Sequence, residues 1–420
     1  MRVLIIGMGG FAGRHHQAVE KLEKTTPVKL VATCDPMAST REEGREKFSL
    51  DERGVHIFTD YREMLAAYAG EALLVVIPTP INLHREMHEA AVRAGFPVYL
   101  EKPPTLNHEE LESMLEVEKT ARKKTMVGFN FIVEELRQKL KQRLLDGEFG
   151  PLESISFHGF WPRARQYFTR NNWGGRLMVN DRLVVDSAMG NAMSHFVHNI
   201  LFWADTESLF SWPRPETVHA ELYRAHSIES TDTLFVSMSA RGIPPIRIFF
   251  THACSGAMEQ KEIIACARAT IVYDVYGEVT VEWKDGRREH FTPGQSLFVE
   301  ENYLAYRDYL EDRAERPPTT LADTRAFVEL YNLTFLAAGR ITTVDHPHLT
   351  LQQRIPKGET EPVEYVAINE IASIARQFLL TGQMPSAQDI PWAVPGGKAT
   401  RADLPQFSAV IRDMYQPQPA

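Results

Sequence analysis

The chain begins with a short apolar run that passes into a glycine-rich turn, Arg2-Val3-Leu4-Ile5-Ile6-Gly7-Met8-Gly9-Gly10-Phe11-Ala12. A nearly continuous apolar run of this length is typical of a β-strand that is buried on both faces of a sheet. A stretch compatible with a helix follows to about Glu23, and a second β-rich run covers residues 28–34. The glycines therefore lie between a strand and a helix, which indicates a parallel sheet covered by helices.

The glycine turn has the spacing G-x-G-x-x-[GA], and the acidic residue Asp35 follows it at the end of the second expected strand, about 20 residues further on. In a dinucleotide-binding turn, Gly7 permits the tight bend, Gly9 lets a pyrophosphate approach the backbone and Ala12 allows close packing of helix on strand. The N–H groups at the helix start, including those of Gly10 and Phe11, would favour the phosphates. The alternative is a glycine turn that binds no ligand.

Asp35 would accept hydrogen bonds from the adenosine ribose, and its charge would repel a 2′-phosphate, which favours NAD over NADP. Ser39, Thr40 and Arg41 lie just beyond Asp35 and could bind that phosphate instead, so NADP stays possible.

Strand and helix patterns alternate with short connections through residue 128, and we expect strands over residues 2–6, 28–34, 55–58, 72–77, 97–100 and 125–128. Six parallel strands are the number of a doubly wound dinucleotide-binding domain. After Gly128 hairpin-like strands dominate, with expected helices near 131–145, 301–312, 321–338 and 361–380. We predict an α/β Rossmann domain over 1–128, an α+β domain with a large, mostly antiparallel open sheet over 129–380, and an extended C-terminal tail over 381–420.

Composition excludes several classes of protein. Of 420 residues 44% are hydrophobic, and 46 Lys and Arg against 55 Asp and Glu give a net charge of −9. These values exclude a disordered or fibrous chain and argue against a nucleic-acid partner. No apolar run approaches the roughly 18 residues of a membrane span. Three isolated cysteines, Cys34, Cys254 and Cys266, favour a reducing cytoplasm.

Three further segments lie at or near the C-terminal ends of expected strands, where open α/β sheets bind ligands: Thr79-Pro80-Ile81-Asn82-Leu83-His84, Glu101-Lys102-Pro103 and Gly128-Phe129-Asn130. Together with the glycine turn and with Ala94-Gly95-Phe96-Pro97-Val98, they resemble the glucose-fructose oxidoreductase / inositol dehydrogenase / MocA family. The resemblance is specific over residues 1–130. It implies a Rossmann domain followed by a domain with a large antiparallel sheet.

The resemblance implies a catalytic role for Lys102, whose ammonium could bind a substrate hydroxyl and stabilise developing alkoxide charge. A surface lysine near a turn is the alternative. Glu101 would contact the cofactor or pair with Lys102. Thr79, Pro80 and His84 would lie near the cofactor, although His84 is equally compatible with a structural role. Asn82, also placed near the cofactor, looks like a helix N-cap.

Members of this family usually supply the acid–base residue as the histidine of an Asp-x-Gly-x-His stretch. His195 aligns best with that histidine, and Asn191 occupies the usual aspartate position, so Asp186 would have to stabilise the imidazolium. If a helix runs through 190–203, Asn191, His195 and His198 share one face. Asn191 and His198 would then contact substrate, although His198 could instead fill the core. A zinc site at the two histidines lacks supporting cysteine or glutamate ligands, and we expect no metal.

Aromatic and arginine side chains alternate between residues 157 and 176, and they include Trp161, Arg163, Arg165, Tyr167, Phe168, Arg170, Trp173 and Arg176. We expect this segment to line a substrate pocket, with Arg163, Tyr167 and Trp173 contacting a sugar-like ring or clamping a carboxylate, and with Asn130 nearby. A subunit interface is an equally good interpretation. Stacking of single-stranded nucleic acid is disfavoured by the net charge.

These expectations converge on an NAD(P)-dependent oxidoreductase that transfers hydride between the nicotinamide and a CH–OH group of a sugar, sugar acid or inositol-like polyol. An enzyme that uses tightly bound NAD only transiently, such as an epimerase or glycosidase, is one alternative. A non-catalytic NAD-sensing protein is another. We expect a cytoplasmic homo-oligomer, a dimer or tetramer, that assembles through the C-terminal sheet and has a small-molecule substrate, with no membrane and no nucleic-acid partner.

Overall fold

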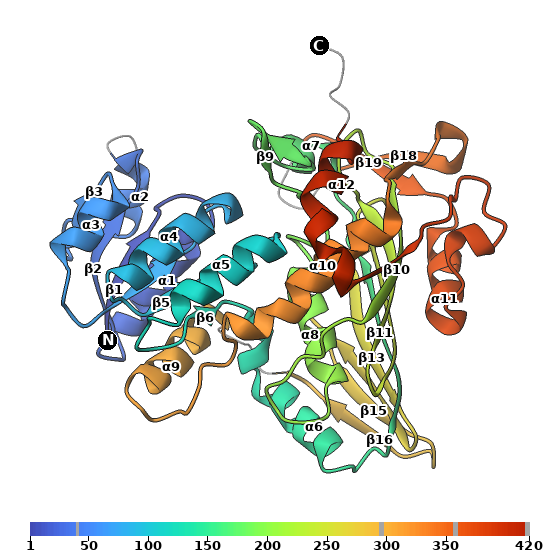
Figure 1. The fold of residues 1–420 in the computed structure, drawn as a ribbon, viewed down its shortest axis with the longest axis horizontal. Coiled ribbons are helices and arrows are strands. Elements are labelled where there is room, and N and C mark those ends of the chain that lie inside the picture. The colour runs from blue at the N-terminus through green and yellow to red at the C-terminus, as the bar shows by residue number, and fades with distance from the viewer. Residues whose placement is uncertain (39–41, 294–297, 356–359, 416–420) are drawn as a thin grey trace. The chain divides into compact units, whose positions relative to one another are not determined.

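The computed structural model describes residues 1–38, 42–293, 298–355 and 360–415, so the candidate 2′-phosphate ligands Ser39, Thr40 and Arg41 lie outside the described residues. The chain forms two compact units (Figure 1). Unit 1 comprises Met1–Gln138 and Gln295–Arg325, and unit 2 comprises Lys139–Gly294 and Ala326–Ala420. Unit 1 is thus larger than the expected 1–128 domain, because a later segment of the chain returns to it.

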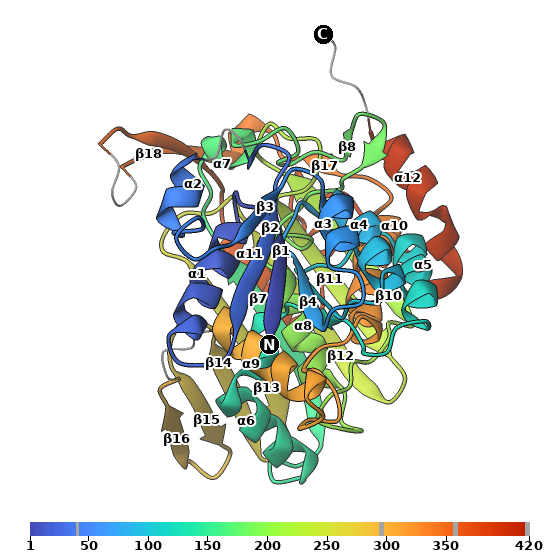
Figure 2. The ribbon, with the colours of Figure 1, turned by 90° about the vertical axis from the view of Figure 1, so that its left-hand side faces the viewer.

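Unit 1 is built on a six-stranded parallel sheet with the strand order β3-β2-β1-β4-β5-β6. The strands are β1 (Arg2–Ile6), β2 (Lys29–Cys34), β3 (His56–Phe58), β4 (Leu73–Ile77), β5 (Val98–Leu100) and β6 (Met126–Val127). This doubly wound order confirms the predicted Rossmann fold, and Figure 2 shows β1 at its centre between β2 and β4. The order reverses at β1 and β4, which is where such sheets bind ligands.

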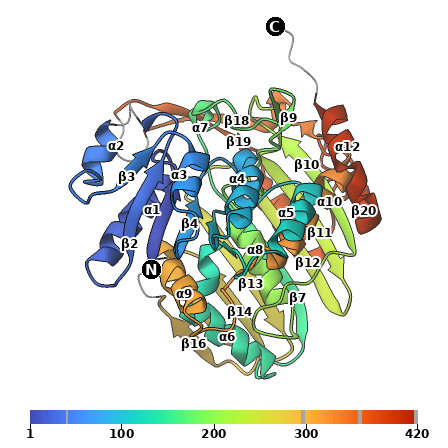
Figure 3. The same ribbon diagram turned by 60° about the vertical axis from the view of Figure 1, so that its left-hand side comes forward.

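The helices that connect these strands are α1 (Ala12–Glu23), α2 (Glu42–Lys47), α3 (Tyr61–Ala67), α4 (Ile81–Arg93) and α5 (His108–Glu118). After β6 the 3₁₀ turn η2 (Asn130–Val133) and α6 (Glu135–Leu145) replace the single helix expected over 131–145. Later in the chain, α9 (Phe298–Leu310) and the 3₁₀ turn η3 (Ala322–Thr324) complete unit 1. Tyr303 and Tyr306 of α9 are fully buried in the core that contains Val3 and Tyr99. Figure 3 gives a second view of α9 and its neighbours.

Unit 2 contains a ten-stranded sheet, which confirms the predicted large, mostly antiparallel sheet. Along its main path the order is β16-β15-β14-β13-β7-β12-β11-β10-β17, and β20 (Lys398–Thr400) pairs with β10. The first half comprises β16 (Arg288–Phe291), β15 (Val279–Trp283), β14 (Ala269–Asp274), β13 (Glu259–Cys266) and β7 (Leu152–Phe160). The second half comprises β12 (Ile243–Thr251), β11 (Thr233–Ala240), β10 (Thr217–Arg224) and β17 (Thr342–Thr343). Only β7–β12 and β10–β17 are parallel among the described pairings of this sheet.

Helices cover both faces of the central strands of this sheet, as Figure 1 shows for α8 and α11. α8 (Ser194–Ala204) packs Phe196 in a stack on Phe157, with ring centroids 5.3 Å apart. α11 (Ile371–Thr381) packs Phe378 against Phe235 on the opposite face. The remaining helices of unit 2 are α7 (Arg165–Thr169), α10 (Arg325–Ala338) and α12 (Phe407–Met414). Two small antiparallel pairs, β8 (Met178–Val179) with β9 (Arg182–Leu183) and β18 (Leu349–Arg354) with β19 (Val363–Ile368), complete its strands.

Two expectations for the C-terminal part differ from the structure. The helix expected over 361–380 begins only at Ile371, because β19 precedes it. Residues 381–420 were expected to form an extended tail, but their described part contains β20 and α12, and α12 buries Phe407 and Ile411. That apolar face, not the proline content of the segment, decides its conformation. No helix in the described ranges has the length and apolar character needed to cross a membrane.

Candidate functional site

The glycine turn of unit 1 adopts a backbone that only glycine tolerates well. Gly7 has a φ of +117° and Gly10 a φ of +56°, both in the left-handed region. A Cβ atom on Gly7 would lie 3.3 Å from the Cβ of Ala12, so the strand and helix are in close contact. No side chain caps the N-terminus of α1, and its first turn contains no acidic residue. The turn therefore presents helix N–H groups and the positive end of the dipole to an anion.

Asp35 lies directly after β2, beside this turn. Its Oδ2 accepts a hydrogen bond from the Met8 backbone N–H at 3.0 Å, and its Oδ1 accepts one from the Met37 N–H at 2.9 Å. The carboxylate is buried. A negatively charged acceptor is thus fixed next to the glycine turn, as the spacing predicted.

Glu101 lies in a buried polar network that the sequence did not reveal. Its Oε1 accepts from Nε2 of His15 in α1, and its Oε2 accepts from the backbone N–H of Lys102, at 3.0 and 3.1 Å. His15 Nδ1 lies 3.0 Å from the hydroxyl of Tyr303 in α9. A Cβ on Gly128 would lie 2.8 Å from Glu101 Oε1, so this glycine leaves room for the carboxylate. Glu101 therefore joins the half-buried Lys102 to α1 and α9.

His84 is a buried structural link. Its Nδ1 and Nε2 lie 3.0 and 2.8 Å from the carbonyl oxygens of Pro103 and Thr79, so the ring ties together the segments that follow β4 and β5. Burial lowers the pKa of His84, although the two carbonyls and Glu101 oppose this effect. The expected N-cap at Asn82 is wrong. The N-cap position is occupied by Pro80, two residues earlier, so α4 begins at Ile81 and Asn82 lies exposed within the helix.

Asn130, expected near substrate, lies buried at the start of η2. Its Oδ1 accepts a hydrogen bond from Nδ2 of Asn302 in α9 at 3.1 Å. The side chain therefore connects the end of the Rossmann sheet to α9.

The histidine segment of unit 2 differs from its expected helix. α8 begins at Ser194, and Asn191 lies in the preceding turn, so the predicted common face of Asn191, His195 and His198 is wrong. Gly190 explains the later start, since a Cβ there would lie 2.9 Å from the Tyr331 hydroxyl of α10 and the chain must turn against that ring. His195 is half-buried in the first turn of α8.

Asp186 and Asn191 lie side by side although they do not share a helix. Asn191 Nδ2 donates to Asp186 Oδ1 at 3.1 Å, and the backbone N–H of Gly175 donates to Asp186 Oδ2 at 2.7 Å. The arrangement puts a carboxylate beside the amide that replaces the family's aspartate. Next to it, Ser187 Oγ lies 3.1 Å from the hydroxyl of Tyr331, which donates to the Val185 carbonyl. No local sequence pattern indicated Tyr331, because it comes from α10.

His198 is fully buried and stacks on Trp212, with ring centroids 4.7 Å apart. Burial alone holds the pKa of His198 well below its ordinary value. A neutral histidine inside an aromatic core has a packing role, so we do not place His198 among the substrate-binding residues.

Cation–π contacts link the aromatic and arginine side chains of residues 161–173 into a ladder. The Arg163 guanidinium lies 4.0 Å from the ring centre of Trp161 and 4.2 Å from that of Tyr167. Arg170 lies 3.7 Å from the Tyr167 ring and 5.2 Å from the Trp173 ring. The structure thus brings together the predicted substrate contacts Arg163, Tyr167 and Trp173.

Comparison with known proteins agrees with this architecture. Residues 1–129 match the model of the GFO_IDH_MocA oxidoreductase family, described as an NAD-binding Rossmann fold. The N-terminal domain is thus similar to the NAD-binding domain of the Gfo/Idh/MocA family. An inositol 2-dehydrogenase of Rhizobium meliloti is 26% identical over 164 residues, and D-glucoside 3-dehydrogenase of Escherichia coli is 26% identical over 152 residues. These alignments cover 39% and 36% of this chain, and less than half of each relative, 46% and 41%.

Solved structures share the Gfo/Idh/MocA fold over more of the chain. The WlbA dehydrogenase from Bordetella pertussis, in complex with NADH and UDP-GlcNAcA, superposes with a TM-score of 0.64 at 21% identity, covering 80% of this chain and 96% of that one. Levoglucosan dehydrogenase, in complex with NADH, gives a TM-score of 0.66 at 18% identity with the same coverage. At these identities the likeness establishes the fold of both units and nothing finer.

Proposed function

We propose that this protein is an NAD-dependent dehydrogenase that oxidises a CH–OH group of a sugar, sugar acid or inositol-like polyol. One observation carries the proposal: the uncapped N-terminus of α1 follows a glycine turn at the switch point of a doubly wound sheet, with Asp35 held beside it. That arrangement is the physical requirement for binding the pyrophosphate and ribose of a dinucleotide.

The residues of unit 1 fit NAD. The N–H groups of the turn and of α1 would hold the pyrophosphate, and the Asp35 carboxylate would accept from the ribose hydroxyls. Bound NAD would supply the hydride acceptor of the reaction. The Asp35 charge disfavours a 2′-phosphate, so we expect a dissociation constant at least tenfold lower for NAD than for NADP. A lower dissociation constant for NADP would contradict the cofactor assignment.

Each unit contributes one candidate group for the proton chemistry. In unit 1, Lys102 follows β5 and its backbone is held by Glu101, so its ammonium would orient a substrate oxygen and stabilise negative charge on it. In unit 2, His195 would take the hydroxyl proton, and Asp186 would provide the nearby negative charge that Asn191 cannot provide. The named activities of the relatives, on inositol and on a D-glucoside, support a polyhydroxylated substrate.

The test is reduction of NAD by a panel of sugars, sugar acids and inositols, followed at the absorbance of NADH. With the best substrate, Lys102→Ala and His195→Ala are expected to lower kcat at least a hundredfold. Lys119→Ala is the matched control, since Lys119 is exposed and pairs only with Glu116 among the described residues. Unchanged kcat in either active-site variant would reject its assigned role, and absence of turnover with intact NAD binding would reject the dehydrogenase.

We also propose that the protein is cytoplasmic and that it forms a homo-oligomer through the C-terminal sheet. The three cysteines are free and buried, which suits a reducing compartment. Strand β14 alternates buried with half-buried residues, the pattern of a sheet with one less-covered face. Light scattering on the purified protein measures the oligomeric state directly, and a monomer at micromolar concentration would contradict the second proposal.

A further inference from the structure

The backbone of the arginine-bearing segment is fixed on both sides of Arg163. Trp161 N–H donates to Thr251 O, and Arg163 N–H donates to His252 O, which extends the β7–β12 pairing beyond the ends of the two strands. His252 Nδ1 donates to the carbonyl of Trp161 at 2.8 Å. His226 Nε2 lies 3.1 Å from the carbonyl of Arg163. Two histidine side chains therefore hold the carbonyls that flank this arginine.

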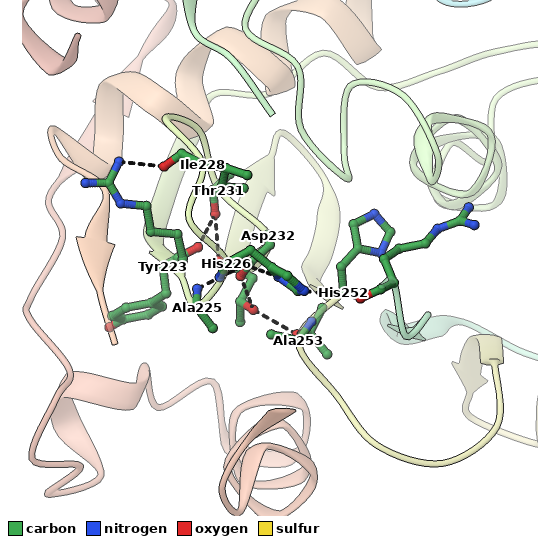
Figure 4. A network of polar contacts seen from close by, with 12 residues as sticks. Tyr223, Ala225, His226, Ile228, Thr231, Asp232, His252 and Ala253 are labelled. Atoms are coloured by element: carbon green, nitrogen blue, oxygen red, sulfur yellow. Dashed lines mark hydrogen bonds and ion pairs between the residues drawn. The ribbon is translucent and has the colours of Figure 1, made fainter. Parts of the chain in front are cut away.

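A buried ion pair supports one of these contacts (Figure 4). His226 Nδ1 lies 2.7 Å from Asp232 Oδ2, and both residues are buried. Asp232 Oδ2 also accepts from the N–H groups of Ala225 and His226. Burial raises the pKa of Asp232, but His226 and these N–H groups outweigh it and lower the pKa overall. Both ring nitrogens of His226 therefore face oxygen atoms, one of the Asp232 carboxylate and one of the Arg163 carbonyl.

The guanidinium that this network positions has no acidic partner among the described residues. Arg163 is half-buried between the rings of Trp161 and Tyr167, and its buried Nε makes no hydrogen bond. Arg170 donates a hydrogen bond to the Tyr167 carbonyl, and no ion pair of Arg170 occurs among the described residues. In contrast, Arg143 and Arg325 each bind glutamate carboxylates. Burial, and then the charge of Arg170, act to lower the pKa of Arg163, so the two cations destabilise each other.

The same segment reaches the Asp186–Asn191 pair. The N–H of Gly175, two residues after Trp173, donates to Asp186, and the N–H of Asp186 donates to the Arg176 carbonyl at 2.8 Å. Backbone hydrogen bonds of Gly175 and Arg176 therefore connect the segment that carries the ladder to Asp186, one of the residues that we assign to proton chemistry in unit 2. Arg176 itself points elsewhere and pairs with Glu229.

We propose that Arg163 and Arg170 form a subsite for an oxyanion, a carboxylate or a phosphate, carried by the sugar-like substrate. This inference rests on the proposed dehydrogenase function and names its substrate class. An oxyanion would accept hydrogen bonds from the guanidinium groups and would neutralise two cations that repel each other. The rings of Trp161 and Tyr167 reduce the exposure of Arg163 to water, which strengthens its interaction with an anion, and they offer faces to a sugar ring. A fixed backbone at Arg163 lowers the entropy cost of binding.

The test compares three substrates of one sugar series: a hexuronate, a hexose 6-phosphate and the neutral hexose. At least one anionic sugar is expected to have a kcat/KM tenfold or more above that of the neutral hexose. Arg163→Met is expected to lower kcat/KM for that anion about ten- to a hundredfold, and to lower it far less for the neutral sugar. Arg163→Lys keeps the charge but not the paired donors. Its kcat/KM for the anion is expected to lie between those of the wild type and Arg163→Met. Arg287→Met is the matched control, because Arg287 also stacks on a tryptophan, Trp283, in unit 2.

The anion that is preferred identifies whether a carboxylate or a phosphate occupies the subsite. Equal use of all three sugars, or an equal loss for all three in Arg163→Met, would overturn the inference while leaving the dehydrogenase intact. If no sugar is oxidised, titration calorimetry with D-glucuronate and glucose 6-phosphate separates the two proposals. Binding that Arg163→Met abolishes supports the subsite without the redox function, and absence of binding to both anions rejects it.

Discussion

Gly128 lies so close to Glu101 that no larger residue fits at this position without displacing its neighbours. A methyl group on Gly128 would lie 2.8 Å from the Glu101 carboxylate and 2.9 Å from the Tyr99 ring, both closer than normal contact. We predict that Gly128→Ala displaces Glu101, and with it the backbone of Lys102, lowering kcat about tenfold and the free energy of unfolding by about 1–3 kcal/mol. Turnover and thermal melting measure both effects. Gly44→Ala is the control, because a methyl group there meets nothing closer than 3.9 Å. Wild-type turnover in Gly128→Ala would reject the link between Gly128 and Lys102.

Asn191 makes a contact that an aspartate could not make at neutral pH. Its amide donates to Asp186 at 3.1 Å, whereas two carboxylates at that distance would repel and the pKa of one would rise. We predict that Asn191→Asp retains turnover at low pH, where the shared proton replaces the amide donor, and loses it as the pH rises through that raised pKa. A pH profile of kcat/KM shows this shape. Asn369→Asp, at an exposed amide that accepts from Thr350, should keep the wild-type profile. If the pH profiles of kcat/KM have the same shape in Asn191→Asp and Asn369→Asp, the prediction is contradicted.

Sequence reasoning succeeded at the residue scale where the chemistry is local. The turn from Gly7 to Ala12 and the acid Asp35 follow from spacing, because neighbouring residues impose the geometry. The partners of Glu101 could not be found in this way. Tyr303 lies 288 residues beyond His15, and no local pattern relates the two.

At the scale of the element, a buried lysine of α6, Lys141, contacts the C-terminal end of α8. Lys141 Nζ donates to the carbonyls of Phe202, at 2.6 Å, Trp203 and Asp205, so the ammonium lies at the negative end of the helix dipole. Burial lowers the pKa of Lys141 to about 7. Between pH 7 and about 10.4 the unfolded chain therefore binds a proton that the folded chain has lost. It follows that stability increases as the pH rises through this window.

We predict that the free energy of unfolding of the wild type rises by up to about 1.4 kcal/mol per pH unit between pH 7.5 and 9.5, and that Lys141→Met removes most of this rise. Urea titration followed by tryptophan fluorescence measures it, since Trp203 and Trp212 both lie in unit 2. The half-buried Lys261, paired with Glu259, provides the control variant Lys261→Met. Equal pH slopes in wild type and Lys141→Met would show that Lys141 remains protonated throughout.

The start of α8 and the identity of β19 show why element boundaries in unit 2 were less predictable. The apolar pattern around His195 suits a helix from residue 190, but contact between Gly190 and Tyr331 delays it to Ser194. Residues 363–368 were assigned to a helix, whereas pairing with β18 makes them a strand. In both cases a partner distant in sequence overrides the local preference.

For the whole molecule, the strand order of unit 1 was predictable because each βαβ connection is short and local. The sheet of unit 2 was predictable only as a class. Its central pair joins β7 in parallel to β12, with residues 161–242 between them in sequence, and hydrophobic periodicity cannot identify such a partner. The sequence analysis also did not predict that α9 packs in unit 1. The apolar pattern of a helix does not identify the core in which the helix is buried.

The packing of α9 in unit 1 makes a prediction about how that unit folds. Tyr303 and Tyr306 of α9 are fully buried among Tyr99, Met126 and other core residues of the Rossmann sheet, and Tyr303 also contacts His15. Loss of a fully buried aromatic side chain costs about 3–5 kcal/mol, so removal of both leaves a Rossmann domain with little stability. We predict that a fragment of residues 1–138 melts without cooperativity and binds NAD weakly, whereas the same fragment joined through a flexible linker to residues 298–325 melts cooperatively and binds NAD.

Circular dichroism melting and the quenching of protein fluorescence by NAD compare the two fragments. A linked fragment that carries both Tyr303→Ala and Tyr306→Ala is the control, because it has the same length and linker without the two buried rings. It should behave like residues 1–138 alone. If the short fragment melts as cooperatively as the linked one, the core of the cofactor domain does not depend on α9. If the linked fragment and its double variant melt alike, the two rings do not stabilise it, and the hydrogen bond from Asn302 of α9 to Asn130 becomes the contact to test next.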